Sequence, residues 1–223
     1  HRYIAEKTAE ILHIPKDEIN LISAHLGNGA SIAAIKGGKS VDTSMGLTPL
    51  EGVMMGTRSG SIDPGLVPYL TERLGYNVEE IDILLNEKSG LLGVSGISND
   101  CRTLEAKAKE GHEASRLALD IFAYRIAKKI ASYLPALQTT DAIVFTGGIG
   151  ENSTYIREVV INYLGFLGFT LNKFSNRACV AGVEGAVGSS PHFGEALVVC
   201  TDEEGMIVRD TLEVVRRNAE KQN

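Results

Sequence analysis

The chain has 223 residues, of which 43% are hydrophobic and 22% charged, and its formal net charge at pH 7 is −6. This composition is typical of a globular protein with one sizeable core, arranged as one large domain or two small ones. No long run of Lys or Arg is present, so we expect no nucleic-acid partner. No apolar run approaches the roughly 20 residues of a membrane span, and the N-terminus lacks the layout of a signal peptide.

The three cysteines, Cys101, Cys179 and Cys200, are far apart and show no CxxC spacing. They predict neither a zinc site nor a disulfide framework, so a reducing, cytoplasmic location is expected. The first residue is His1 rather than Met, and a helical pattern is already under way there. The sequence is therefore interpreted as a fragment of a longer protein.

The first elements in chain order are a helix and three short strands. Helical spacing predicts a helix over residues 1–12, ended by Pro15. Strand-like runs follow at residues 20–26, 30–35 and 39–42, and Gly37-Gly38 between the last two is a hairpin signal. Three consecutive antiparallel strands are therefore expected, with the turn Gly27-Asn28-Gly29 joining the first two.

The middle of the chain is a long loop followed by helices. Residues 43–65 are rich in Gly, Ser and Thr and too long for an ordinary connection, so this loop is functional or disordered. Helices are predicted at residues 66–75 and 77–87, the second opened by a capping box of Asn77 and Glu80 and closed by Gly90. A further loop reaches Asp100, and two more helices are predicted at residues 103–110 and 113–134, the latter ended by Pro135.

The last third alternates buried strands with helices. An apolar run predicts a strand at residues 142–145, followed by the glycine turn 147–150 and a helix over residues 154–164. A second buried strand is predicted at residues 196–200, then a cap at 201–202 and a last helix over residues 203–221. Strand, glycine turn and helix in this order are typical of a nucleotide site.

This order of elements predicts an α/β domain with a mixed sheet flanked by helices. It resembles the ribonuclease H-like fold of the actin, Hsp70 and sugar-kinase superfamily. In that superfamily a glycine turn between the first two strands holds phosphates, and two such domains enclose ATP in a cleft. The resemblance implies that residues 1–223 form a single ATP-binding domain.

Two segments are candidates for phosphoryl chemistry. The turn Gly27-Asn28-Gly29 allows backbone N–H groups to approach an anion closely, although an ordinary hairpin turn is the commoner meaning of such a string. Arg58 is a candidate to offset charge on a transferring phosphoryl group, and the alternative is a solvated Arg in a flexible loop. Asp63, before Pro64, is expected to shape the turn rather than to contact substrate.

Three strings resemble motifs of the acetate kinase family and occur in the family's order: HLGNGAS from His25, DTSMGLTPLEGVMMGTRSGSIDP from Asp42, and FTGGIGENS from Phe145. The similarity extends from residue 1 to the final helix. Sugar kinases and chaperone ATPases lack the long middle string. The resemblance implies an ATP:carboxylate phosphotransferase that uses Mg²⁺ and moves a phosphoryl group between ATP and acetate, giving acetyl phosphate and ADP.

The resemblance also implies roles for the positions that bind the reacting groups. His25, Asn28 and Gly29 match positions at the phosphoryl region, and Arg58 matches the residue that stabilises the in-line transition state, so His25 and Arg58 are the predicted catalytic residues. Pro49 matches a position that borders the pocket for the acyl methyl group. A histidine at a strand end is, taken alone, more often a structural hydrogen-bonding residue.

The nucleotide and the metal are assigned in the same way. Asp100 and Arg102 match positions that contact the adenosine. Glu203 matches a carboxylate that helps to hold magnesium through water, although a carboxylate at a helix N-terminus also simply complements the helix dipole. The positions that pack along the adenine and ribose are matched by Gly148, Ile149 and Asn152.

Roughly the first half of an acetate kinase is missing, and His1 matches the second His of the family's F-H-G-T-S-H motif. Phosphoryl transfer needs both walls of the cleft, so the chain alone is expected to bind nucleotide weakly and to turn over little. A catalytically inert nucleotide-binding or dimerisation module, and a propionate or butyrate kinase of the same family, remain alternatives. The family also implies a homodimer. Four residues of the long predicted helix would serve equally as a dimer face or as core: Leu117, Ile121, Tyr124 and Ile130.

Overall fold

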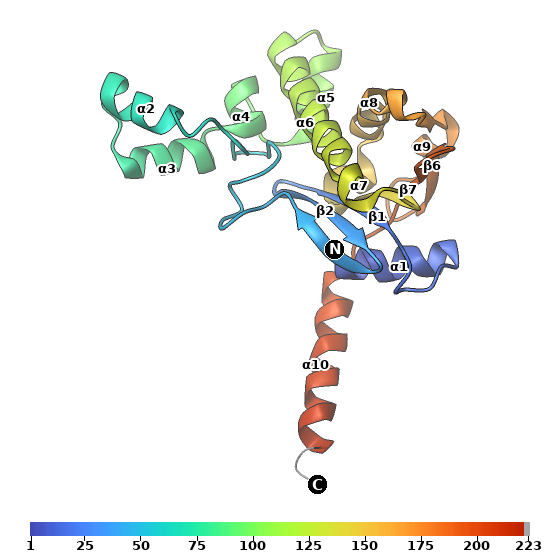
Figure 1. Ribbon diagram of the computed structural model, residues 1–223. Helices are drawn as coiled ribbons and strands as arrows, with labels where there is room; N and C mark the ends of the chain where they lie inside the picture. Colours follow the sequence, from blue (N-terminus) through green and yellow to red (C-terminus); the bar gives the residue numbers. More distant parts are fainter. Residues whose placement is uncertain (221–223) are drawn as a thin grey trace.

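A mixed sheet forms the centre of the molecule in the computed structural model, which describes residues 1–220 (Figure 1). Within these residues the sheet has seven strands in the order β3-β2-β1-β4-β7-β6-β5. β1 pairs parallel with β4 and β4 parallel with β7, whereas the other neighbours are antiparallel. The strands are β1 (Leu21–Leu26), β2 (Ala30–Lys36), β3 (Lys39–Thr43), β4 (Ala142–Thr146), β5 (Thr170–Leu171), β6 (Gly185–Ser190) and β7 (Gly194–Val198).

Helices cover both faces of this sheet. The long helix α6 packs against β1 and β2 and against α4, α5 and α8, and α1 contacts the sheet from the other side (Figure 1). The helices are α1 (Arg2–Leu12), α2 (Leu66–Leu74), α3 (Val78–Glu87), α4 (Gly90–Ser95), α5 (Cys101–Lys109), α6 (Glu113–Leu137), α7 (Gly147–Asn152), α8 (Thr154–Tyr163), α9 (Lys173–Ala178) and α10 (Glu203–Glu220), with a 3₁₀ turn at Gly165–Leu167.

Alternation along β4 divides the core into two layers. Phe145 belongs to the larger layer together with Phe122 of α6. Val144, the preceding residue of the strand, belongs to the layer on the opposite face, together with Ile4 of α1. Successive side chains of a strand point to opposite faces, so a strand covered on both sides is apolar at every position.

The structure confirms the mixed α/β sheet and the three antiparallel strands at its start. β1 and β2 pair from Leu26 and Ala30 outward, which leaves residues 27–29 as the turn. Asn77 and Glu80 form the predicted capping box of α3. Asp63 accepts a hydrogen bond from the Gly65 amide at 2.9 Å, which is the predicted shaping of the turn before α2.

Several boundaries differ from the sequence predictions. The loop expected after Gly90 begins with helix α4, and the expected glycine turn at residues 147–150 is the short helix α7. Helix α6 continues past Pro135 to Leu137, because a proline in the last turn removes only one backbone hydrogen bond. The pattern also missed β5, β6 and α9; β6 is built of Gly, Ala, Val and Ser, which do not show an apolar alternation.

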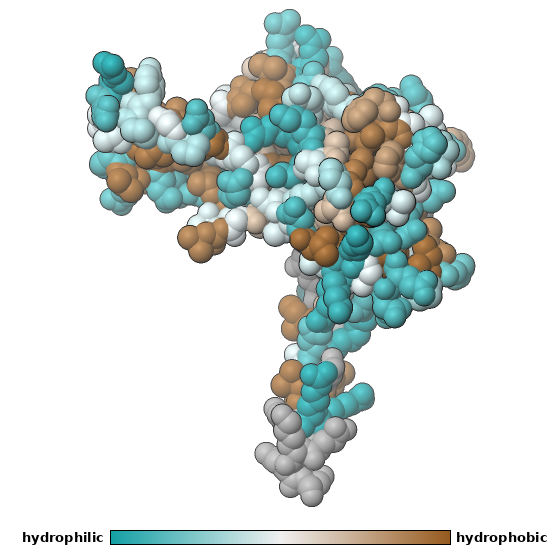
Figure 2. Space-filling model, in the orientation of Figure 1, coloured by the Kyte–Doolittle hydropathy of each residue, from teal (hydrophilic) through white to brown (hydrophobic). Residues whose placement is uncertain are grey.

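Two parts of the molecule extend from the body, the α2–α3 pair and helix α10 (Figures 1 and 2). Near its start α10 is attached by an ion pair between Arg2 and Asp210, and by Arg209, which lies 3.4 Å from the Glu6 carboxylate. Its apolar residues Ile207, Val208, Leu212, Val214 and Val215 are exposed. In the part of the chain that the structure describes, no helix is long and apolar enough to cross a membrane.

Replacing Phe122 by Ala tests the larger core layer. This side chain is fully buried, so its truncation is expected to lower the free energy of unfolding by about 3–5 kcal/mol. Leu117→Ala, at a position of the same helix that is 55% exposed, is the control and is expected to change stability by no more than about 0.5 kcal/mol. Denaturant unfolding followed by circular dichroism measures both, and equal losses in the two variants would contradict the packing described here.

Candidate functional site

The turn between β1 and β2 is covered by the loop over residues 43–65. The Gly27 amide donates to the Gly29 carbonyl at 3.0 Å, which closes the turn. The Gly56 amide donates to the Asn28 carbonyl at 3.0 Å, and a Cβ atom on Gly56 would lie only 1.9 Å from Asn28 Oδ1. The glycine at position 56 therefore lets the loop lie against the turn without displacing the Asn28 side chain.

Arg58 is held above this turn by backbone hydrogen bonds. Amides of Ser89, Leu91 and Leu92, at the start of α4, donate to carbonyls of loop residues 55–57 at 2.9 Å each. Nη1 of Arg58 lies 3.7 Å from the Met55 sulfur and would lie 3.6 Å from a Cβ atom on Gly29. This part of the loop is anchored at its backbone, and it brings the guanidinium to the face of the predicted phosphate turn.

His25 lies one residue before the end of β1, opposite Thr146 of β4 and Ser31 of β2. The ring of His1 contacts β1 and β2: its Nδ1 lies 2.9 Å from Ser23 Oγ, and its Nε2 lies 2.9 Å from Ser31 Oγ. His25 itself is half-buried and lines a hollow of about 470 Å³. The other residues of this hollow are Gly147, Gly148, Thr201, Asp202 and Glu204.

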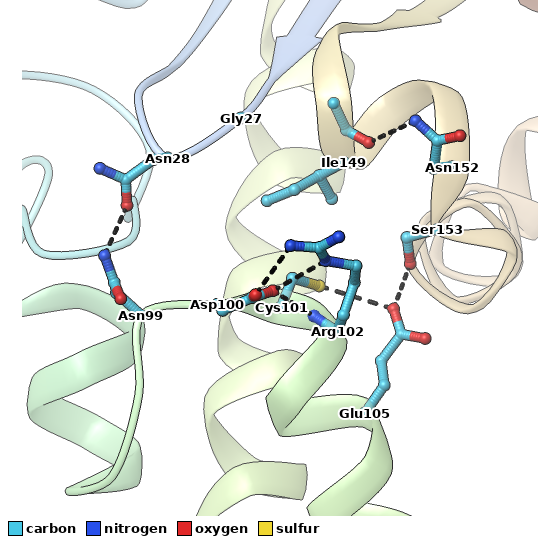
Figure 3. Close-up of a pocket in the computed structure, with 11 residues that line it drawn as sticks. Gly27, Asn28, Asn99, Asp100, Cys101, Arg102, Glu105, Ile149, Asn152 and Ser153 are labelled. Carbon is cyan, nitrogen blue, oxygen red and sulfur yellow. Dashed lines mark hydrogen bonds and ion pairs between the residues drawn. The ribbon is translucent and has the colours of Figure 1, made fainter. Parts of the chain in front are cut away.

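A larger cavity of about 510 Å³ lies beside this hollow and shares Gly148 with it. Its walls come from the β1–β2 turn, the start of α5, and α7 with the start of α8 (Figure 3). The structure thus brings together six of the predicted site residues: Asn28, Asp100, Arg102, Gly148, Ile149 and Asn152. Five further residues complete the lining: Gly27, Asn99, Cys101, Glu105 and Ser153.

Asp100 and Arg102 form an ion pair at the mouth of this cavity. Asp100 caps α5 by accepting from the Arg102 amide at 2.9 Å, and Nη2 of Arg102 donates to its other carboxylate oxygen at 3.0 Å. The hydrogen bond from the Arg102 side chain holds the pKa of Asp100 below its usual range. The Arg102 side chain is 88% exposed, so it is accessible to a ligand while Asp100 remains ionised.

Helix α7 follows β4 without a linker and forms the opposite wall. Gly147 has a φ of 76°, and a Cβ atom there would lie 2.9 Å from the Leu26 carbonyl oxygen, so the chain turns from strand to helix at a glycine. Asn152 lines the cavity, but its side chain is already engaged. Its Nδ2 donates to the Gly148 carbonyl at 3.0 Å and its Oδ1 accepts from the Ala181 amide at 3.0 Å.

Sequence reasoning missed a polar bridge between two walls of the cavity. Glu105 of α5 accepts a hydrogen bond from Ser153, the N-cap of α8, and lies 3.5 Å from the Cys101 sulfur (Figure 3). Burial, together with the Glu105 carboxylate, raises the pKa of the Cys101 thiol far above its usual range. The position of Ser153 before a helical run is a visible cap signal. The partner of Ser153 is 48 residues earlier in the chain, and no local pattern indicates it.

Three described residues of the predicted site line neither cavity: Gly29, Pro49 and Arg58. Pro49 is exposed on the loop and lines neither cavity, so its assignment to the acyl pocket stays a prediction. Glu203 is the first residue of α10, and its side chain lies outside the described part of the structure. Among the described residues, no group of three or more His, Cys, Asp or Glu side chains is arranged to hold a metal ion.

Comparison with known proteins gives consistent matches along nearly the whole chain. The model of the Acetokinase family matches residues 1–209. An acetate kinase of Chromobacterium violaceum is 53% identical over 211 residues, which are 95% of this chain and 53% of that protein. An acetate kinase 2 of Neisseria meningitidis is 54% identical over 214 residues, 96% of this chain and 54% of that protein. The chain thus spans about half the length of the curated relatives it matches.

Solved structures give the same picture. The structure of Porphyromonas gingivalis acetate kinase matches with a TM-score of 0.91 and 44% identity, over 96% of this chain and 54% of that one. A propionate kinase from Francisella tularensis matches with a TM-score of 0.86 and 46% identity, over 93% of this chain and 52% of that one. Sequence and fold agree over the segment that carries the glycine turn, the Arg58 loop and helix α7, and the chain belongs to the acetokinase family.

Proposed function

We propose that this chain is the nucleotide-binding half of an acetate kinase, which transfers a phosphoryl group between ATP and acetate. The observation that carries the proposal is the placement of Arg58. Backbone hydrogen bonds hold its guanidinium at the face of the Gly27–Gly29 turn, and this turn also lines the 510 Å³ cavity between α5 and α7. In this proposal the cavity takes the nucleoside and the turn beside it takes the phosphates. The Arg58 guanidinium, next to the turn, takes the transferring phosphoryl group.

In this proposal the adenosine lies against Gly148 and Ile149, with Asp100 and Arg102 at the mouth of the cavity. Asn28 and Gly29 then face the phosphates, because their turn forms the end of the cavity toward Arg58. Arg58 offsets the negative charge that spreads over the equatorial oxygens of the phosphoryl group during in-line transfer. His25, at the adjoining hollow, donates a hydrogen bond to the same group.

Mg²⁺ would supply charge neutralisation at the phosphates when bound. The adjoining hollow offers oxygen ligands, from Thr201, Asp202 and Glu204, and this donor set suits a hard cation that keeps several waters. Glu203 lies between two of these residues in the sequence and is proposed to act with them. The described carboxylates of the hollow are few enough that water and phosphate oxygens would complete the coordination.

The proposed acid substrate is acetate. Acetate is favoured by the names of the relatives, and the F. tularensis propionate kinase, at 46% identity, makes a longer acid the second candidate. The predicted acyl-pocket residue, Pro49, is exposed here, so the rest of that pocket must come from elsewhere in a complete enzyme.

A homodimer and a cytoplasmic location are part of the same proposal. On α6, Ile130 is buried and Ile121 packs partly buried against the core, whereas Leu117 and Tyr124 are exposed. Tyr124 lies against Tyr163 of α8, with ring centroids 5.2 Å apart, and the two tyrosines form an exposed aromatic surface. This surface is proposed as part of the contact with a second copy.

The first test is acyl phosphate formation from acetate and Mg-ATP, trapped as a hydroxamate. We expect little or no product from the chain alone, and product when the N-terminal half of an acetate kinase is added, because the transition state needs both walls of the cleft. Nucleotide binding without activity in either mixture would favour the inert-module alternative. Appreciable synthesis by the chain alone would contradict the split site.

The second test is the replacement of Arg58 by Ala in the reconstituted enzyme. We expect kcat to fall by about 10³-fold or more, while the KM for ATP changes little, because Arg58 is proposed to act on the transferring group and not on the nucleoside. Arg73→Ala, on the exposed helix α2, is the matched control and should leave both constants unchanged. An effect of Arg58→Ala confined to the KM for ATP would assign this residue to nucleotide binding instead.

A further inference from the structure

Among the residues that the structure describes, Arg157 of α8 is the largest fully buried side chain. Burying a charged group is costly unless it is paired and hydrogen-bonded. In the described part of the chain no carboxylate lies within ion-pair distance of Arg157. Burial lowers the pKa of its guanidinium to about 10, so the group is still charged at neutral pH. The protein therefore buries a charged guanidinium at a cost in free energy. The hydrogen bonds of Arg157 show which segments this group connects.

Four hydrogen bonds satisfy the guanidinium, and all of them go to uncharged oxygens. Nη1 donates to the Gly150 carbonyl at 2.8 Å. Nε donates to Asn176 Oδ1 at 2.7 Å, and Nη2 donates to the Asn176 carbonyl at 2.7 Å and to the Cys179 carbonyl at 2.8 Å. One planar group thus joins α7 to α9 and to the residue that follows α9.

The first of these acceptors belongs to the wall of the nucleotide cavity. Helix α7 has only six residues, and Gly147, Gly148 and Gly150 are among them. A short helix rich in glycine has little stability of its own, and its last four carbonyls have no partners within the helix. Arg157 supplies such a partner to Gly150. The backbone of Gly148 and Ile149, which lines the cavity, is therefore fixed from behind.

A second connection reaches the same wall from the other end. Asn176, which accepts from Arg157, donates from Nδ2 to the Thr154 carbonyl at 2.9 Å, in the first turn of α8. The segment after α9 returns to α7 through the Ala181 amide, which donates to Asn152 at 3.0 Å. Arg157 and Asn176 therefore form one hydrogen-bonded network behind the cavity, and the segment over residues 179–181 links it to Asn152.

We propose that Arg157 is a positioning residue of the nucleotide site: it sets the place of α7 and so determines nucleotide affinity without contacting the nucleotide. This inference rests on the proposed function, which assigns the cavity to ATP. Lysine cannot replace it, because an ammonium group donates from a single nitrogen, whereas the guanidinium fork reaches acceptors on three sides.

The test compares Arg157→Lys and Asn176→Ala with Val160→Ala in the full chain. Val160 is fully buried on the same helix, packs in the main core and is outside the network, so it controls for loss of stability alone. Two quantities are measured: the Kd for Mg-ADP by equilibrium dialysis, and amide hydrogen exchange over residues 147–153. Denaturant unfolding ranks the three variants by stability.

We expect Arg157→Lys to raise the Kd for Mg-ADP about tenfold or more and to speed exchange in α7. Asn176→Ala removes only one of the four acceptors, should retain the fold, and should shift both quantities in the same direction by a smaller factor. Val160→Ala should lower stability and leave the Kd and the α7 exchange as they are. If Arg157→Lys does not fold, Asn176→Ala and Val160→Ala make the same comparison.

An unchanged Kd and unchanged α7 exchange in folded Arg157→Lys or Asn176→Ala would overturn the inference. Failure of the parent chain to bind Mg-ADP would instead count against the proposed function. In that case hydrogen exchange still decides the role of Arg157. Faster exchange in α7 of Arg157→Lys and Asn176→Ala, but not of Val160→Ala, supports positioning. Equal exchange in all three variants contradicts it.

Discussion

The candidate site depends on two places where a glycine lies close against another segment, in one case against a side chain and in the other against backbone. A Cβ atom on Gly56 would lie 1.9 Å from Asn28 Oδ1, and one on Gly90 would lie 2.2 Å from the Met55 carbonyl oxygen. Gly90 also has a φ of 64°, which residues with a Cβ atom rarely adopt. These contacts press the loop between the β1–β2 turn and α4. Hydrogen bonds of the loop backbone thus fix the place of Arg58, which forms no ion pair in the described part of the chain.

The sequence predicted those parts of the fold in which the residue pattern of a helix or strand depends on that element alone. Residues 142–145 are apolar at every position because both faces of β4 are covered, and Asn77 with Glu80 caps α3 within four residues. β6 could not be predicted, because its glycine at position 188 reflects a contact with a neighbouring strand. A Cβ atom on Gly188 would lie 2.4 Å from the Thr170 carbonyl oxygen. The small side chains of β6 reflect a neighbour and not a local preference.

The candidate site divides in the same way. The resemblance to the acetate kinase family identified residues that line the cavity from a helix start and a glycine-rich segment, such as Asp100 and Gly148. Glu105 and Arg157 were not identified. Each is an ordinary charged residue within a helix, and its contacts include acceptors or donors up to 48 residues away in the chain. Contacts between distant segments, at the cavity wall for Glu105 and behind it for Arg157, appear only when the chain is folded.

Cys101 gives this cavity a built-in chemical reporter. The thiol is 4% exposed although the residue lines the cavity, and its pKa is raised, so almost no reactive thiolate is present in the closed state. Alkylation at Cys101 therefore requires a local opening that exposes the thiol. The labelling rate, read from the mass of the peptide that contains Cys101, measures the free energy of that local opening. A bound ligand that closes the two walls would slow the reaction in proportion to its occupancy.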